Sequence, residues 1–149
     1  MTTVPPGRRP AAPPEILDDD PPLSAIMTRD VVTLDAEARA ATALHVMATT
    51  GVRHLPVVDH GRFLGVVFET DLVCCLTAAA LPPAETVTTA LRQLHRPTAQ
   101  LPPTARVSDA ARHMSTDASD AVLVTDHDRI LGIVTATDLV HLLARRHAP

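Results

Sequence analysis

The sequence predicts an α+β fold built from two β-α-β-β-α repeats. Two stretches read almost alike, GVVFETDL at 65–72 and GIVTATDL at 132–139. Residues 32–73 also align with residues 99–140 without a gap, at a constant separation of 67 positions. In both stretches an apolar run typical of a buried strand passes directly into a helical pattern. Strands, turn and helix that recur together in register indicate an internal duplication.

The composition excludes several function classes. The chain has 149 residues, enough to bury the core of one domain, and its formal net charge of −4 argues against nucleic-acid binding, which favours a basic face. No apolar run approaches the roughly 18 residues that a membrane-spanning helix requires. Arg8 and Arg9 are followed by PAAPPE rather than by an apolar segment, so they do not predict export. We therefore expect a cytoplasmic protein with no nucleic-acid or membrane partner.

Residues 1–22 are expected to form a disordered or extended tail. Seven prolines fall in this stretch. Because proline lacks an N–H group and fixes φ, no helix or strand ladder can run through it. An inert tail and a partner-binding polyproline segment both fit this composition.

Residues 23–80 form the first predicted repeat. Its expected elements are an apolar turn at 23–27, a strand at 31–34, a helix at about 36–50, strands at 54–58 and 63–68 joined by a polar turn at 59–62, and a helix at 71–77. Asp35 is a candidate cap for the first helix, and Gly51 is a typical helix end. Pro56 is expected at a sheet edge or a strand start, because it cannot donate a ladder hydrogen bond.

Residues 81–95 are expected to form a linker and a lead-in helix at 86–94, and residues 96–149 the second repeat. The expected elements of the second repeat are a strand at 99–101, a helix at 105–115, strands at 121–125 and 130–135 around a turn at 126–129, and a helix at 138–145.

The duplicated pattern resembles the cystathionine-β-synthase (CBS) domain, which occurs in tandem pairs called Bateman modules. The resemblance covers about residues 23–146 and rests on HLPVVD at 54–59 together with the stretches at 65–72 and 132–139. It implies two repeats packed about a pseudo-twofold axis. It also implies a regulatory ligand such as AMP, ADP, ATP or S-adenosylmethionine, bound in a cleft between the repeats rather than held as a tight cofactor.

In this family a Gly-h-h-Thr-x-x-Asp signature holds the ribose, and Gly132, Thr135 and Asp138 match it. A carboxylate offers two acceptor oxygens to the two adjacent hydroxyl donors of a ribose, and a threonine hydroxyl can donate or accept beside it. The same spacing also fits a capping box, which closes the first turn of a helix and needs no ligand. The sequence fits both the ribose-binding and the capping interpretation.

The first repeat departs from the signature, because Phe68 stands where Thr135 stands while Asp71 remains. We therefore expect the first site to be weak or empty, with Phe68 filling the cleft, packing under the helix or turning into the core. Arg53 and His54 precede Pro56, where the family often carries basic residues that reach phosphates. A solvated arginine and a strand-edge histidine are the alternative.

The resemblance also implies where an adenine would lie. Its edge would meet the backbone at Ala99, Gln100, Val122 and Leu123, and the last two side chains would form aliphatic walls.

The sequence shows no catalytic constellation and no metal-ligand spacing. We expect a non-enzymatic sensor that passes its signal to a separate effector protein. The resemblance implies a homodimer that pairs the helices at 36–50 and 71–77 and their counterparts. The alternative is a ligand-free interaction or scaffold pair that kept the fold and lost the sites.

Overall fold

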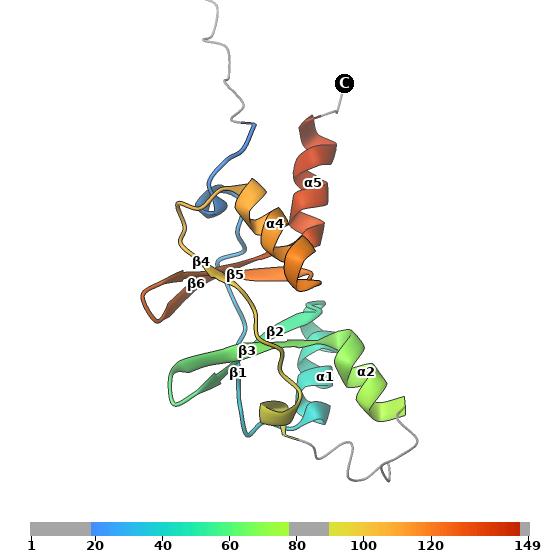
Figure 1. The fold of residues 1–149 in the computed structure, drawn as a ribbon. Helices are drawn as coiled ribbons and strands as arrows, with labels where there is room; N and C mark the ends of the chain where they lie inside the picture. Colours follow the sequence, from blue (N-terminus) through green and yellow to red (C-terminus); the bar gives the residue numbers. More distant parts are fainter. Residues whose placement is uncertain (1–18, 78–89, 147–149) are drawn as a thin grey trace, which may run out of the picture.

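The computed structural model describes residues 19–77 and 90–146 and confirms an α+β fold with two three-stranded sheets. The two sheets face each other at the centre, and the helices of each repeat lie on the outer side of their sheet (Figure 1). The resulting order of layers is helices, sheet, sheet and helices. The two β-α-β-β-α repeats are packed as a pseudo-twofold pair.

The first repeat follows a 3₁₀ turn and keeps the predicted order of elements. Its elements are η1 (Leu23–Ala25), β1 (Leu34–Asp35), α1 (Ala40–Thr50), β2 (His54–Asp59), β3 (Arg62–Phe68) and α2 (Glu69–Thr77). β2 is the central strand, parallel to β1 and antiparallel to β3. Gly51 ends α1 as predicted: it has a φ of 75°, and its N–H donates to the Met47 carbonyl oxygen at 2.9 Å.

The second repeat has the same order and topology. Its elements are η2 (Leu91–Gln93), β4 (Gln100–Leu101), α4 (Val107–Asp117), β5 (Ala121–Asp126), β6 (Arg129–Thr135) and α5 (Ala136–Arg146). α2 and α5 each begin two residues earlier than predicted, because β3 and β6 run into them without a loop. Residues 86–89 of the expected helix at 86–94 lie outside the described residues, and 91–93 form a 3₁₀ turn rather than an α-helix.

Two expectations near β1 are wrong. The strand begins at Leu34, so residues 31–33 lie outside it. Asp35 does not cap α1, which begins five residues later. The Asp35 carboxylate instead accepts the Glu37 N–H at 2.9 Å and closes a turn before the helix, a local bond that aspartate often makes.

Pro56 lies in the central strand of its sheet rather than at an edge. It is tolerated there because β1 pairs only with Val57 and Val58, beyond the proline. Its counterpart in the second repeat, Leu123, donates its N–H to the Ala99 carbonyl at 2.9 Å. Proline cannot make that bond.

Three buried clusters form the core. The first lies between the first sheet and its helices and includes Leu55, Val57, Leu72 and Leu91. The second lies between the second sheet and its helices and includes Leu23, Ala110, Val124 and Val134. The third joins the two sheets and consists of Val66, Phe68 and Leu123.

The segments that lead into the repeats are exchanged in space. Leu23, which precedes the first repeat, is buried in the core of the second, and Leu91, which precedes the second, is buried in the core of the first. Thr28 pairs with Ile133 on β6, and Arg96 pairs with Val66 on β3. Each lead-in segment therefore fastens one repeat to the other.

Gly65 and Gly132 lie where these segments cross the sheets. A Cβ on Gly65 would stand 2.3 Å from the Arg96 carbonyl oxygen, and one on Gly132 would stand 2.8 Å from the Thr28 carbonyl oxygen. Both glycines are thus required by backbone packing.

Candidate ligand-binding cleft

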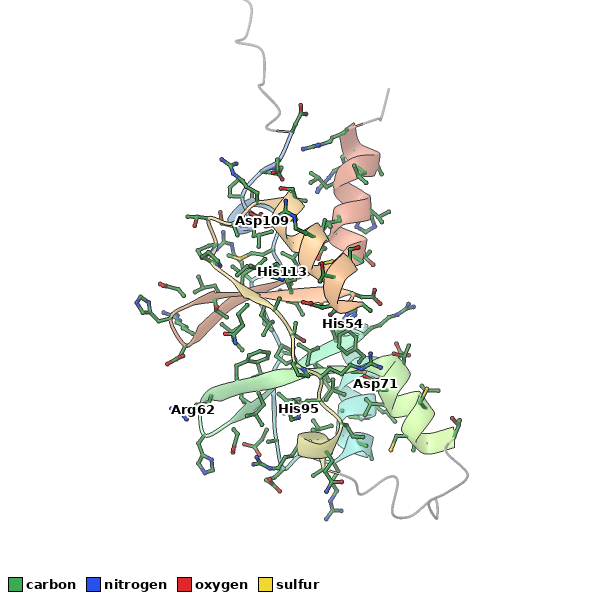
Figure 2. The ribbon with its side chains drawn as sticks, in the orientation of Figure 1. His54, Arg62, Asp71, His95, Asp109 and His113 are labelled. Atoms are coloured by element: carbon green, nitrogen blue, oxygen red, sulfur yellow. The ribbon has the colours of Figure 1, made fainter. Side chains whose placement is uncertain are left out.

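A cleft of about 300 Å³ lies between the two repeats, where β3 enters α2 and β6 enters α5. Its lining residues are Arg53, His54, Phe68, Glu69, Thr70, Asp120, Thr135, Ala136 and Thr137. Most of them occupy equivalent positions in the two repeats, 67 residues apart. The cleft therefore lies on the pseudo-twofold axis. Figure 2 shows His54 in this region, between the two halves of the molecule.

The predicted pair Thr135 and Asp138, here named the second clamp, is brought together at the start of α5. The Thr135 N–H donates to Asp138 Oδ2 at 2.7 Å, and the Thr135 hydroxyl donates to the same oxygen at 2.9 Å. The backbone bond is the one that a capping box requires of its fourth residue. The Asp138 half of a capping box is therefore present, while the Thr135 hydroxyl bonds the Asp138 carboxylate rather than a helix N–H. Within the described residues Asp138 Oδ1 accepts no hydrogen bond.

The matching residues of the first repeat, Phe68 and Asp71, are here named the first clamp. The Phe68 side chain is 8% exposed and packs with Val66 and Leu123 between the sheets, while it also forms part of the cleft wall. Asp71 does not line the cleft, and neither does its counterpart Asp138. Its Oδ1 forms an ion pair with Arg96, whose guanidinium carbon lies 5.6 Å from the centre of the Phe68 ring.

Sequence reasoning did not place Arg96 at the first clamp. Arg96 follows η2 and was assigned to the start of the second repeat, yet it reaches the first clamp because the lead-in segments are exchanged. Thr70 and Thr137 were also missed. Each is the second residue of its helix, directly after the β3–α2 or β6–α5 junction. Their position at a helix start is the sequence feature that could have predicted them.

Arg53 and His54 both lie on the cleft. Arg53 Nε stands 3.5 Å from Glu69 Oε2, and its side chain is 79% exposed. The His54 ring meets the edge of Phe68 in a T-shaped contact with ring centres 5.0 Å apart. Asp120, the repeat counterpart of Arg53, lines the opposite side. The cleft thus carries two carboxylates and one guanidinium, and one of the carboxylates is paired with that guanidinium.

The four predicted adenine-contact residues do not line this cleft. The Val122 and Leu123 side chains are at most 1% exposed and lie in two different core clusters. Val122 packs between the second sheet and its helices, whereas Leu123 packs between the two sheets, and an adenine contact with their backbone stays a prediction. Gln100 is exposed on β4, and Ala99 lines a separate hollow with Arg96, Pro97, Thr98 and Asp117.

Burial lowers the pKa of His54 below its ordinary value of 6.5, although the carboxylates of Asp120, Asp138 and Glu69 oppose the shift. The neighbouring guanidinium of Arg53 lowers this pKa further. His54 is therefore neutral at pH 7 and adds no positive charge to the cleft.

This shift predicts a pH dependence of stability. Below pH 6.5 the unfolded chain protonates His54 before the folded chain does, so the free energy of unfolding falls as the pH drops through the pKa of folded His54. Between pH 7.5 and pH 5 the melting temperature of His54→Gln should fall less than that of the wild type. His141→Gln, which changes an exposed histidine on α5, is the control. Equal slopes for His54→Gln and the wild type would contradict the assignment.

Within the described residues no group of three or more His, Cys, Asp or Glu side chains could hold a metal ion. No helix in the described part of the chain is long and apolar enough to cross a membrane. The cytoplasmic location stays a prediction.

A family model for the CBS domain matches residues 23–78 and 93–145. The chain therefore belongs to the CBS domain family and carries two copies of the domain. CBS pairs are regulatory modules rather than enzymes, in agreement with the non-enzymatic function expected from the sequence.

Two relatives match over less than half of this chain. An uncharacterized 17.7 kDa protein of Acidianus ambivalens is 35% identical over 60 residues, which are 40% of this chain and 37% of that protein. The uncharacterized protein MJ1225 of Methanocaldococcus jannaschii is 32% identical over 57 residues, which are 38% of this chain and 20% of that protein. The match spans well under half of either relative.

Solved structures match over both repeats. A candidate acetoin utilization protein (AcuB) from Vibrio cholerae aligns with a TM-score of 0.69 at 24% identity, over 86% of this chain and 98% of that one. MJ1225, described as a candidate archaeal homologue of γ-AMPK, aligns with a TM-score of 0.71 at 25% identity, over 85% and 49%. The CBS domain pair of MJ0100, in complex with 5′-methylthioadenosine and S-adenosylmethionine, aligns with a TM-score of 0.73 at 22% identity, over 85% and 98%. These structures share the fold of this chain.

Proposed function

We propose that this CBS pair senses an adenosyl ligand, which it binds at the second clamp in the cleft between the repeats. The observation that carries the proposal is that the carboxylate of the second clamp lies next to the cleft wall without a cation beside it among the described residues. Thr135 lines the cleft, and no ion pair in the described part of the chain joins Asp138 to a cation. The adenosyl ligands of the MJ0100 pair support the proposal, since that pair shares this fold.

A ribose would exchange one internal hydrogen bond to the Asp138 carboxylate for two from the ligand. The Thr135 hydroxyl donates to Asp138 in this structure, and the Thr135 N–H bond to the same carboxylate would keep the helix capped. The ribose hydroxyls would then donate to Asp138, and the Thr135 hydroxyl would turn to the ligand. Hydrogen bonds to a charged group contribute about 1.5–3 kcal/mol each.

Charge in the cleft favours ligands without a phosphate chain. Asp120 and Glu69 line it, Arg53 is paired with Glu69, and the neutral His54 does not compensate them. Against this, the N-termini of α2 and α5 attract anions. We therefore expect 5′-methylthioadenosine and S-adenosylmethionine, which carry a neutral or positive 5′ group, to bind more tightly than ADP and ATP, with AMP between them.

A thermal-shift series with these compounds tests the proposed function. A ligand at about 100 times its Kd adds about 2.7 kcal/mol to the free energy of unfolding, which is a shift of several degrees for a chain of this size. We expect the largest shift with 5′-methylthioadenosine or S-adenosylmethionine. No shift with any compound would reject adenosyl sensing and would favour the ligand-free scaffold.

The proposed output is a change in how the two repeats pack. A ligand in the cleft touches residues of both repeats, so it stabilises the relative packing that presents those residues best. An effector protein that binds one packing better than the other would then read the ligand concentration. Such an effector would bind the chain more tightly either with or without ligand, which affinity capture under the two conditions compares.

We also propose that the chain forms a homodimer through its outer helices. Val73 and Leu76 on α2 are 47% and 39% exposed, and their counterparts Val140 and Leu143 on α5 are 61% and 56% exposed. Each pair is spaced by three residues and forms an apolar stripe on a helix. The pseudo-twofold arrangement provides two such stripes, which a second copy of the chain would cover.

The dimer is expected to dissociate when charge is placed in the stripes. The wild type should have twice the chain mass in light scattering, and Val73→Glu combined with Val140→Glu should have the mass of one chain. Val32→Glu is the matched control, because Val32 is also exposed (39%) but lies before β1 and away from the helices. A wild type with the mass of one chain, or a double variant that stays dimeric, would exclude this interface.

A further inference from the structure

The two clamps differ in what faces them. In the first repeat Arg96 pairs with Val66 on β3 and reaches the carboxylate of Asp71. In the second repeat Thr28 pairs with Ile133, the counterpart of Val66. Thr28 is therefore structurally equivalent to Arg96. Thr28 has no charge. Its neighbour Arg29 donates to the Ser24 carbonyl at 2.9 Å.

Arg96 presents to the first clamp the features that an adenosyl ligand would present. Its guanidinium donates to Asp71, as the hydroxyls of a ribose would. Its planar group also lies over the ring of Phe68, with 5.6 Å between the guanidinium carbon and the ring centre. The first clamp is therefore filled by a side chain of the same molecule.

The carboxylate of Asp71 depends on this contact. The Asp71 side chain is 17% exposed, and its Oδ2 is buried without a hydrogen-bond partner among the described residues. A carboxylate so enclosed is costly without a compensating cation. A ligand that displaced Arg96 would have to replace this ion pair with neutral hydroxyl donors.

We propose that Arg96 is an internal occupant of the first clamp and that it limits the chain to one adenosyl ligand. This inference rests on the proposed function, since it concerns the number of sites. Phe68 and Arg96 act together: the ring replaces the clamp hydroxyl, and the guanidinium neutralises the clamp carboxylate. Their counterparts Thr135 and Thr28 place neither a ring nor a cation at the second clamp.

The test exchanges these residues between the clamps. Phe68→Thr with Arg96→Thr gives the first clamp the residues of the second. Thr28→Arg with Thr135→Phe does the reverse. Each protein is titrated calorimetrically with 5′-methylthioadenosine and with ATP, after circular dichroism has shown that it is folded. We expect one ligand per chain for the wild type, two for the opened variant and none for the closed variant.

The outcomes separate the two proposals. If the wild type binds one ligand and the folded opened variant also binds one, the role of Arg96 is overturned and adenosyl sensing stands. The same holds if the closed variant still binds. A wild type that binds two ligands also overturns the inference. If no variant binds either compound, the proposed function fails and this inference fails with it.

Discussion

The Gly65→Ala variant is expected to melt about 6–12 °C below the wild type. The added Cβ would stand 2.3 Å from the Arg96 carbonyl oxygen and 2.7 Å from His95 Cδ2. The same carbonyl accepts the Val66 N–H at 2.9 Å, and the Arg96 N–H donates back to Val66 at 2.9 Å. Because backbone cannot move aside as a flexible side chain can, we expect a cost of about 3 kcal/mol, at the upper end of overpacking.

Gly61→Ala separates crowding from backbone strain. Gly61 has a φ of 77° but nothing within 4 Å of the added Cβ, so its substitution should cost about 1–2 kcal/mol from the left-handed conformation alone. The loss of stability in Gly132→Ala should lie between the losses in Gly65→Ala and Gly61→Ala, because the Met27 side chain can move while the Thr28 carbonyl cannot. If Gly65→Ala melts no lower than Gly61→Ala, the lead-in segment does not hold β3 as described.

The Asp138→Ala variant is expected to bind adenosyl ligands about 10- to 150-fold more weakly than the wild type. This range corresponds to a net loss of one hydrogen bond to a charged group, about 1.5–3 kcal/mol, because the ribose makes two bonds to Asp138 and releases the one from the Thr135 hydroxyl. Calorimetric titration with S-adenosylmethionine measures it. The variant also loses the bond from the Thr135 N–H, so its melting temperature should fall by a few degrees without ligand.

Asp109→Ala is the matched control for that loss of a cap. Asp109 holds the same position in α4, where its Oδ2 accepts the Arg106 N–H at 3.0 Å, far from the cleft. Both variants should lose a similar amount of stability, and only Asp138→Ala should lose binding. Equal affinity in Asp138→Ala and the wild type would show that the carboxylate does not hold the ribose.

The sequence predicts the repeat architecture because local patterns determine it. The stretches at 65–72 and 132–139 form the strand–helix junctions as expected, and Gly51 ends α1. Each of these features depends on residues that are neighbours along the chain. The Thr135–Asp138 contact belongs to the same class, because three residues at a helix start bring the two side chains together.

The sequence could not predict contacts that depend on which repeat each lead-in segment packs against. Leu23 and Leu91 are apolar residues before a repeat, and nothing local shows that each enters the core of the other. For that reason the pairing of Arg96 with Asp71 was missed. The surroundings of Val122 and Leu123 could not be predicted for a related reason, since an apolar pattern marks burial without showing what the side chains are buried against.

The most direct measurement is a titration of the ¹⁵N-labelled chain with S-adenosylmethionine, followed by NMR. Binding in the cleft between the repeats predicts that the largest amide shifts fall on Thr135, Thr137 and Asp120, with smaller ones on Arg53 and His54. Amide shifts confined to the hairpin turns at His60 and His127, at the other ends of β2 and β5, would place the ligand elsewhere. No shifts with this ligand or with 5′-methylthioadenosine would contradict the account.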